Sequence, residues 1–212
     1  MERRIDMKEV SDGRLYRAND LVKADCGGCE GCSACCQGMG SSITLDPQDL
    51  FQLYRGLQMD FDRLLEGGRI ELNLVDGLIL PNLKMTKAEE NCTFLNREGR
   101  CSIHPLRPGI CRMFPLGRLY ENGSFRYFLQ IHECPKEGRR KIKVKKWLDL
   151  PEIDRYERFV CDWHDYVKDL QKKVGQDPEQ IKPVSMELLN RFYRTPYDPS
   201  GDFYEQFYER MQ

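Results

Sequence analysis

The first clear apolar pattern in the chain predicts an α-helix over residues 46–68. Asp46 suits the N-cap position and Pro47 the first helical position, because a cap accepts a free backbone N–H and proline lacks one. Apolar side chains then recur at the spacing of one helical face; they are Leu50, Phe51, Leu53, Tyr54 and Leu57. Gly67-Gly68 marks the expected end of this helix.

Alternation of apolar and polar residues then predicts strands joined by tight turns. The segment RIELNLVDGLILPNLKM alternates around Asp76-Gly77, a dipeptide that tolerates the positive φ angles of a hairpin turn. Asn122-Gly123 predicts a second hairpin within GRLYENGSFRYFLQ, and Glu98-Gly99 predicts a third between CTFLN and RCSIH. The middle of the chain is therefore expected to be mostly β.

The pattern changes to helical spacing from Leu150 onward. An apolar stripe predicts a helix that ends at Gly175; its members are Ile153, Tyr156, Phe159, Val160, Trp163, Val167 and Leu170. A further helix is expected over residues 177–193, and the aromatic-rich GDFYEQFYERMQ predicts a terminal helix docked on the body. We therefore predict an α+β protein: a cysteine-rich domain with β-hairpins and a metal-binding loop over residues 1–149, and a helical extension over 150–212. The two parts are expected to form one structural unit.

Composition and charge narrow the class of protein. The chain has 212 residues, 40% of them hydrophobic, which is enough for a single buried core. The first residues form a charged, polar lead-in without the apolar segment of an export signal, and we expect a soluble, cytoplasmic protein. With 33 basic and 34 acidic residues, the net charge gives no general attraction to a membrane or to nucleic acid, and neither is an expected partner.

One local basic run, RRKIKVKK at residues 139–146, is compatible with two interpretations. A strand that turns Ile142 and Val144 inward leaves a solvated basic face, and we prefer this interpretation because no aromatic residues are interleaved. Contact with RNA, an acidic partner or a phosphate-bearing ligand is the alternative.

Ten cysteines carry the candidate chemistry, and five of them lie in CGGCEGCSACC, residues 26–36. Reducing conditions in the cytosol disfavour structural disulfides. A thioredoxin-like site requires one CxxC at the start of a helix after a strand, and this glycine-rich loop lacks that context. Cysteine at every third residue instead lets thiolates in a tight loop converge on a metal. The second group, at strand ends and turns, could complete a mixed site; it comprises Cys92, Cys101, Cys111 and Cys134.

The spacing leaves the metal open between iron and zinc. CxxCxxC resembles the first three ligands of a bacterial ferredoxin loop, and Cys134-Pro135 resembles its cysteine–proline fourth ligand, which favours an iron–sulfur cluster such as 4Fe-4S. Paired CxxC units also build zinc sites with four thiolates, so zinc is the alternative. Eight thiolates are enough for two centres.

The loop, the segment CTFLNREGRCSIHPLRPGICRMFP and the final ECP together resemble the YkgJ-type cysteine-cluster proteins, which carry the CxxCxxCC zinc- or iron-chelating domain. The resemblance implies eight metal ligands: Cys29, Cys32, Cys35, Cys36, Cys92, Cys101, Cys111 and Cys134. Cys26 and Cys161 lie outside this pattern, and Cys161 is expected to be a small buried hydrophobe on its helix. His104 stands where the family commonly has tyrosine, which implies a structural histidine.

A function follows only in outline from these residues. Thiolates around a metal leave negative charge, which Arg107 or Arg112 can offset by hydrogen bonds toward sulfur. The preferred hypothesis is a redox or electron-transfer role for an iron–sulfur cluster. A zinc-stabilised structural or interaction module is the alternative. A second alternative is an accessory role in protein modification, since a flagellin lysine methylase contains the same domain. No substrate, protein partner or oligomeric state is predicted.

Overall fold

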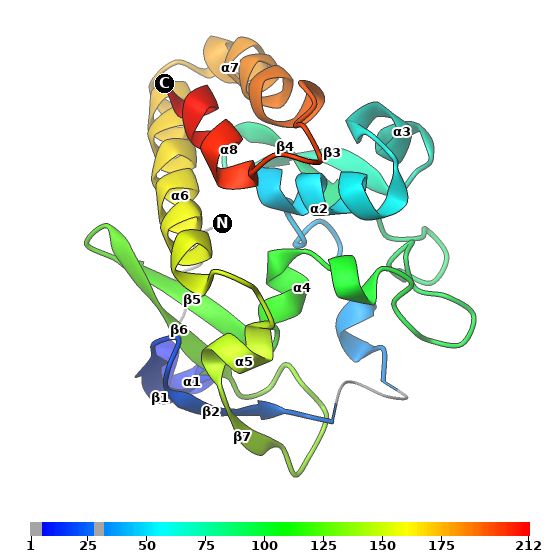
Figure 1. Cartoon of the computed structure of the whole chain (residues 1–212), viewed down its shortest axis with the longest axis vertical. Coiled ribbons are helices and arrows are strands. Elements are labelled where there is room, and N and C mark those ends of the chain that lie inside the picture. Colours follow the sequence, from blue (N-terminus) through cyan, green and yellow to red (C-terminus); the bar gives the residue numbers. More distant parts are fainter. Residues whose placement is uncertain (1–5, 28–31) are drawn as a thin grey trace.

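A computed structural model describes residues 6–27 and 32–212 and confirms the predicted α+β class (Figure 1). Three small antiparallel sheets have the strand orders β1-β6-β5, β2-β7 and β3-β4. The strands are β1 Ser11–Tyr16, β2 Leu21–Asp25, β3 Ile70–Val75, β4 Leu78–Leu83, β5 Leu116–Glu121, β6 Ser124–Gln130 and β7 Arg140–Lys143. The α-helices are α1 Met7–Val10, α2 Pro47–Leu57, α3 Phe61–Glu66, α4 Gly109–Met113, α5 Val144–Leu148, α6 Ile153–Gln176, α7 Ile181–Leu189 and α8 Phe203–Met211.

Two of the three predicted hairpins are confirmed. Asp76 and Gly77 have φ angles of 47° and 88° between β3 and β4, and Asn122 and Gly123 have 53° and 68° between β5 and β6. The third predicted turn also forms, with Gly99 at φ 69°, but its flanks pair antiparallel through a single isolated bridge between Leu95 and Cys101 and make no extended strands. The segment beyond this bridge is helical and contains two prolines, which cannot donate to a strand ladder. This part of the chain is therefore not β.

The predicted helix over residues 46–68 is two helices. The first, α2, begins as expected at Pro47 but ends at Leu57, because Gln58 adopts a left-handed conformation with φ 56°. Asp60 then caps α3 by accepting a hydrogen bond from the backbone N–H of Arg63. A second N-cap residue within the apolar run thus restarts the helix.

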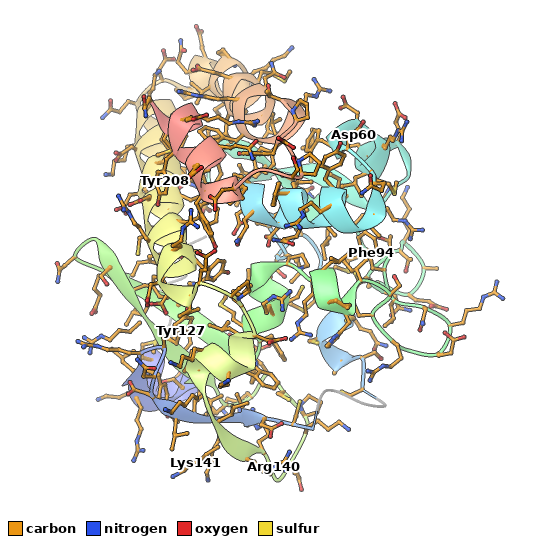
Figure 2. The ribbon with its side chains drawn as sticks, in the orientation of Figure 1. Asp60, Phe94, Tyr127, Arg140, Lys141 and Tyr208 are labelled. Atoms are coloured by element: carbon orange, nitrogen blue, oxygen red, sulfur yellow. The ribbon has the colours of Figure 1, made fainter. Side chains whose placement is uncertain are left out.

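The N-terminal lead-in and the basic run also differ from expectation. The polar lead-in contains two strands: β1 pairs with β6 and β2 pairs with β7, and Tyr16, Val22 and Ala24 of these strands are buried in a second small core. The basic run is a strand only over β7, and Val144 starts α5 and is fully buried. Arg140 and Lys141 lie on β7 at the edge of the molecule, with their side chains directed away from the body (Figure 2).

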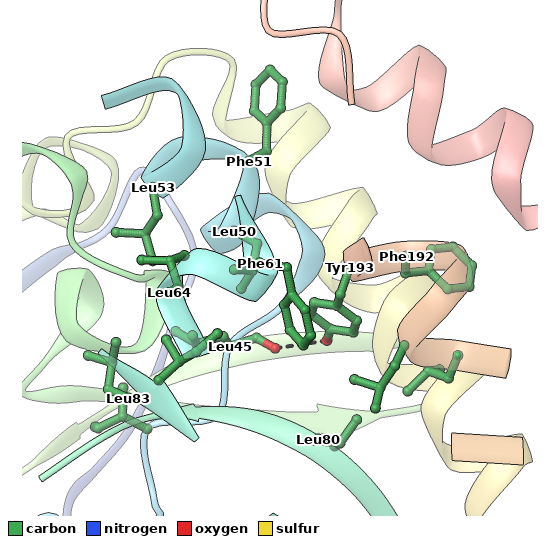
Figure 3. Packing of buried hydrophobic residues seen from close by; sticks show 14 of the residues in the cluster. Leu45, Leu50, Phe51, Leu53, Phe61, Leu64, Leu80, Leu83, Phe192 and Tyr193 are labelled. Carbon is green, nitrogen blue, oxygen red and sulfur yellow. Dashed lines mark hydrogen bonds between the residues drawn. The ribbon is translucent and has the colours of Figure 1, made fainter. Parts of the chain in front are cut away.

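The helices after residue 150 share one hydrophobic core with α2 and the β3-β4 hairpin. The long helix α6 runs along the side of the molecule, α8 lies beside α2, and α7 packs on β4 (Figure 1). A 3₁₀ turn over residues 178–180 precedes α7 and a π-helical turn over 190–194 follows it. The Tyr193 hydroxyl in that turn donates a 2.9 Å hydrogen bond to the Leu45 carbonyl, just before α2 (Figure 3). Across residues 6–27 and 32–212, no helix has the length and apolar character to span a membrane.

Candidate metal centre

Six cysteines from two distant parts of the sequence line one cavity of about 110 Å³. Three come from the loop and three from the segment over residues 92–111: Cys32, Cys35, Cys36, Cys92, Cys101 and Cys111. The rest of the wall is largely apolar and includes Ile43, Leu83 and Phe114. The fold thus brings together most of the cysteines that sequence analysis assigned to a metal.

Backbone hydrogen bonds attach the cysteine loop to the second group. Cys35 and Cys36 lie in a 3₁₀ turn, and the Cys36 carbonyl accepts a 2.8 Å hydrogen bond from the N–H of Cys92. Gly38 donates a further hydrogen bond of 2.9 Å to the carbonyl of Glu90. Glycine at this position adopts a φ of 65°, which is strained for other residues. The loop is therefore positioned by the chain around Cys92.

Cys111 is positioned differently, on the short helix α4. The first residue of that helix, Gly109, donates its N–H to the Asp49 carboxylate of α2 at 2.7 Å. The same carboxylate accepts the N–H of Asp46, and Asp46 in turn accepts the N–H of Asp49, so the two residues form a capping box. Burial raises the pKa of the Asp46 carboxyl to about 6; burial and the charge of Asp46 raise that of Asp49 well above its ordinary value.

The role of Asp49 gives a testable result. Asparagine offers one oxygen where the carboxylate offers two, so Asp49→Asn leaves a buried N–H, of Asp46 or Gly109, facing an NH₂ group. We expect this to lower the free energy of unfolding by about 1–3 kcal/mol. Asp60→Asn is the matched control, because Asp60 accepts a single N–H and asparagine caps helices equally well. Urea denaturation that gives equal stabilities for the two variants would contradict this role.

Burial favours the protonated form of three of the thiols that line the cavity. Burial raises the pKa of Cys92 and of Cys101, and raises that of Cys111 well above its ordinary value. A hydrogen bond between Cys36 and Cys35 lowers the pKa of Cys35 to about 7, with a smaller contribution from Arg107, and raises that of Cys36. A cation bound by these thiols must therefore displace several protons.

Both arginines singled out in the sequence lie at the wall of this cavity. The positive charge of Arg107 acts on Cys35 and Cys101, and its Nη1 lies 2.9 Å from His104 Nδ1. Arg112 is buried, and its Nη2 donates to the Pro105 carbonyl at 2.7 Å. Its Nη1 donates to two more carbonyls, those of Leu148 and Asp149. Arg107 thus supplies charge near the thiols, whereas the hydrogen bonds of Arg112 hold the surrounding backbone.

The remaining cysteines are placed elsewhere or not described. Cys29 lies outside the described residues, and Cys134, in the loop after β6, is not among the described residues that line the cavity. Cys161 is half-buried on α6 rather than buried as predicted, and Cys26 is also half-buried. Among the described residues, no three His, Cys, Asp or Glu side chains converge closely enough to hold an ion.

Sequence analysis identified the thiols but missed Asp49. The pattern Asp-Pro-Gln-Asp marks the start of α2 and a capping box, yet only the fold shows that the second carboxylate also reaches Gly109, sixty positions further along the chain.

Comparison with known proteins agrees with this arrangement of cysteines. The family model CxxCxxCC, described as a putative zinc- or iron-chelating domain, matches residues 28–135, slightly more than half of the 212 residues. No curated protein and no solved structure matches the chain.

Proposed function

Because the chain belongs to the CxxCxxCC family of zinc- or iron-chelating domains, we propose that its cysteine-lined cavity holds an iron–sulfur cluster and that the protein works in electron transfer. Family membership supports metal binding in general, and the finer assignment rests on the residues around the cavity. The observation that carries it is the set of six thiols from two chain segments around one mostly apolar cavity.

The donor set and the size of the cavity both favour a cluster over a single ion. Thiolates suit iron–sulfur clusters and zinc alike, but one tetrahedral zinc uses only four of them. The cavity of about 110 Å³ is several times the roughly 30 Å³ that one water occupies in the liquid, so more than one ion fits. We propose as ligands cysteines from this wall, with Cys29 and Cys134 as further members of the family's eight.

The surrounding residues suit an electron-transfer role. When bound, an iron–sulfur cluster accepts and returns single electrons. Arg107 offsets the negative charge of thiolates at Cys35 and Cys101, which favours the reduced, more negative state. Apolar side chains on the wall, among them Ile103 and Trp147, limit the access of water, which is a second determinant of reduction potential.

The test is anaerobic purification followed by an absorption spectrum and by assays of iron, acid-labile sulfide and zinc on the same sample. We expect brown protein with matched iron and sulfide, bleached reversibly by dithionite. Colourless protein that keeps stoichiometric zinc after anaerobic iron–sulfur reconstitution would refute the cluster and support the zinc-stabilised module, since zinc has a filled d shell and no redox chemistry.

A further inference from the structure

A second and larger cavity, of about 700 Å³, lies on the other side of α4 from the cysteines. Ile110 and Met113 of α4 line this second cavity, whereas Cys111 between them lines the first. Its other walls come from the start of α2, from β5 and from α6. In Figure 1 these elements surround the centre of the molecule, between the α2 layer and the β1-β6-β5 sheet. The volume is in the range of sites for small molecules, about 300–1,000 Å³.

Aromatic rings make up much of the wall. The rings of Tyr120 and His164 are stacked face to face, with centroids 3.6 Å apart and planes 4° apart. Trp163, on α6, and Tyr193 lie in an edge-to-face arrangement with centroids 6.0 Å apart. Such rigid, flat surfaces favour a ligand with a flat apolar body, which can stack against them.

One charged group at the cavity has a donor atom without a hydrogen-bond partner. Arg118, on β5, lines the cavity, and its Nη2 donates a 2.5 Å hydrogen bond to the Tyr156 hydroxyl. Its Nε–H is buried and has no partner among the described residues. A buried donor without an acceptor is costly, and a guanidinium is matched best by a carboxylate or a similar oxyanion.

The carboxylates of the same cavity are already engaged. Asp49 accepts the backbone N–H groups of Asp46 and Gly109, and Asp46 accepts that of Asp49. These two carboxylates therefore serve the start of α2 and of α4, whereas the Nε–H of Arg118 has no hydrogen-bond partner among the described residues. The charges of Asp46 and Asp49 act on Arg118, so it is the buried Nε–H that favours a ligand, one that brings an acceptor.

We propose that this cavity binds a small organic acid, whose flat apolar body lies against Trp163 and Tyr120 and whose acid group is bound by Arg118. The site is separate from the cysteine cavity, and the proposal does not depend on which metal the cysteines hold. Since α4 separates the two cavities, a bound acid lies next to the helix that carries Cys111.

The test uses two fluorescent probes of similar shape on the purified full-length protein: anionic anilinonaphthalene sulfonate and uncharged phenylnaphthylamine. We expect the sulfonate to bind at one saturable site. Arg118→Gln should weaken that binding about ten- to a hundred-fold, as for the loss of a charge-assisted hydrogen bond, and leave binding of the neutral probe unchanged. Arg118→Lys, which keeps the charge, should restore part of the affinity. Val167→Trp, which fills the cavity from α6, should abolish binding of both probes.

Arg126→Gln is the matched control, because Arg126 is an exposed arginine on the neighbouring strand β6 and does not line this cavity. Circular dichroism and metal content are measured on every variant, so that unfolding or loss of metal is recognised separately. The proposal is overturned if the wild-type protein shows no saturable sulfonate site, if Arg118→Gln binds the sulfonate with wild-type affinity, or if that folded variant loses both probes equally.

Discussion

Replacing Cys101 with serine should remove the metal and much of the stability of the protein. Cys101 lines the cysteine cavity together with five other thiols, and it forms the bridge that closes the turn over residues 97–99. Serine is a poor ligand for iron or zinc, so the site loses one of its soft donors. Structural zinc contributes about 10–16 kcal/mol to small domains, which is comparable to the total of about 5–15 kcal/mol that stabilises a typical fold.

The measurement is metal per protein chain together with thermal unfolding, for Cys101→Ser and for Cys161→Ser as the matched control. Cys161 is also a half-buried cysteine, but it lies on α6 outside the cysteine cavity. We expect metal content to fall to near zero in the first variant only, with a large drop in its melting temperature. Equal metal content and equal melting temperatures in the two variants would show that the cavity is not the metal centre.

Local signals in the sequence predicted several elements well. The two hairpins with Asp-Gly and Asn-Gly turns were predictable because the positive φ angles of these turns restrict the residues that form them. The long helix α6 was predictable because its apolar stripe continues over several turns, and it extends only one residue beyond the expected end at Gly175. Six of the eight cysteines that the spacing and the family resemblance pointed to line one cavity.

Features that depend on distant contacts could not be read from local patterns. Strands β1 and β2 are stabilised by pairing with β6 and β7, more than one hundred residues away, and each is only five or six residues long with a weak apolar pattern of its own. Arg118 looks like an ordinary strand arginine in the sequence, and only the fold leaves its Nε buried without a partner. The hydrogen bond between Gly109 and Asp49 likewise depends on the packing of two segments that are distant in the sequence. Interactions that arise from the packing of distant segments could therefore be identified only in the structure.

The aromatic core under the C-terminal helices leads to the second large effect. Phe159, on α6, is fully buried, and its ring contacts Phe203 and Phe207 of α8 edge to face, with centroids 5.2 and 4.7 Å apart. Phe159→Ala removes these contacts and leaves a cavity, so we expect it to lower the free energy of unfolding by about 3–5 kcal/mol. Met186→Ala is the control; this side chain on α7 is 38% exposed, and the cost should stay within about 0.5 kcal/mol.

The same variant tests whether residues 150–212 unfold with the cysteine domain. The core that contains Phe159 also contains Cys92, Phe94 and Ile103, so the two parts share buried surface. Because a shared core is lost cooperatively, we expect circular dichroism and metal release to follow one urea transition in the wild-type protein and in Phe159→Ala, at a lower midpoint in the variant. Two separate transitions, with metal release unchanged by the substitution, would instead mean that the helical extension is an independent unit and contributes no stability to the metal centre.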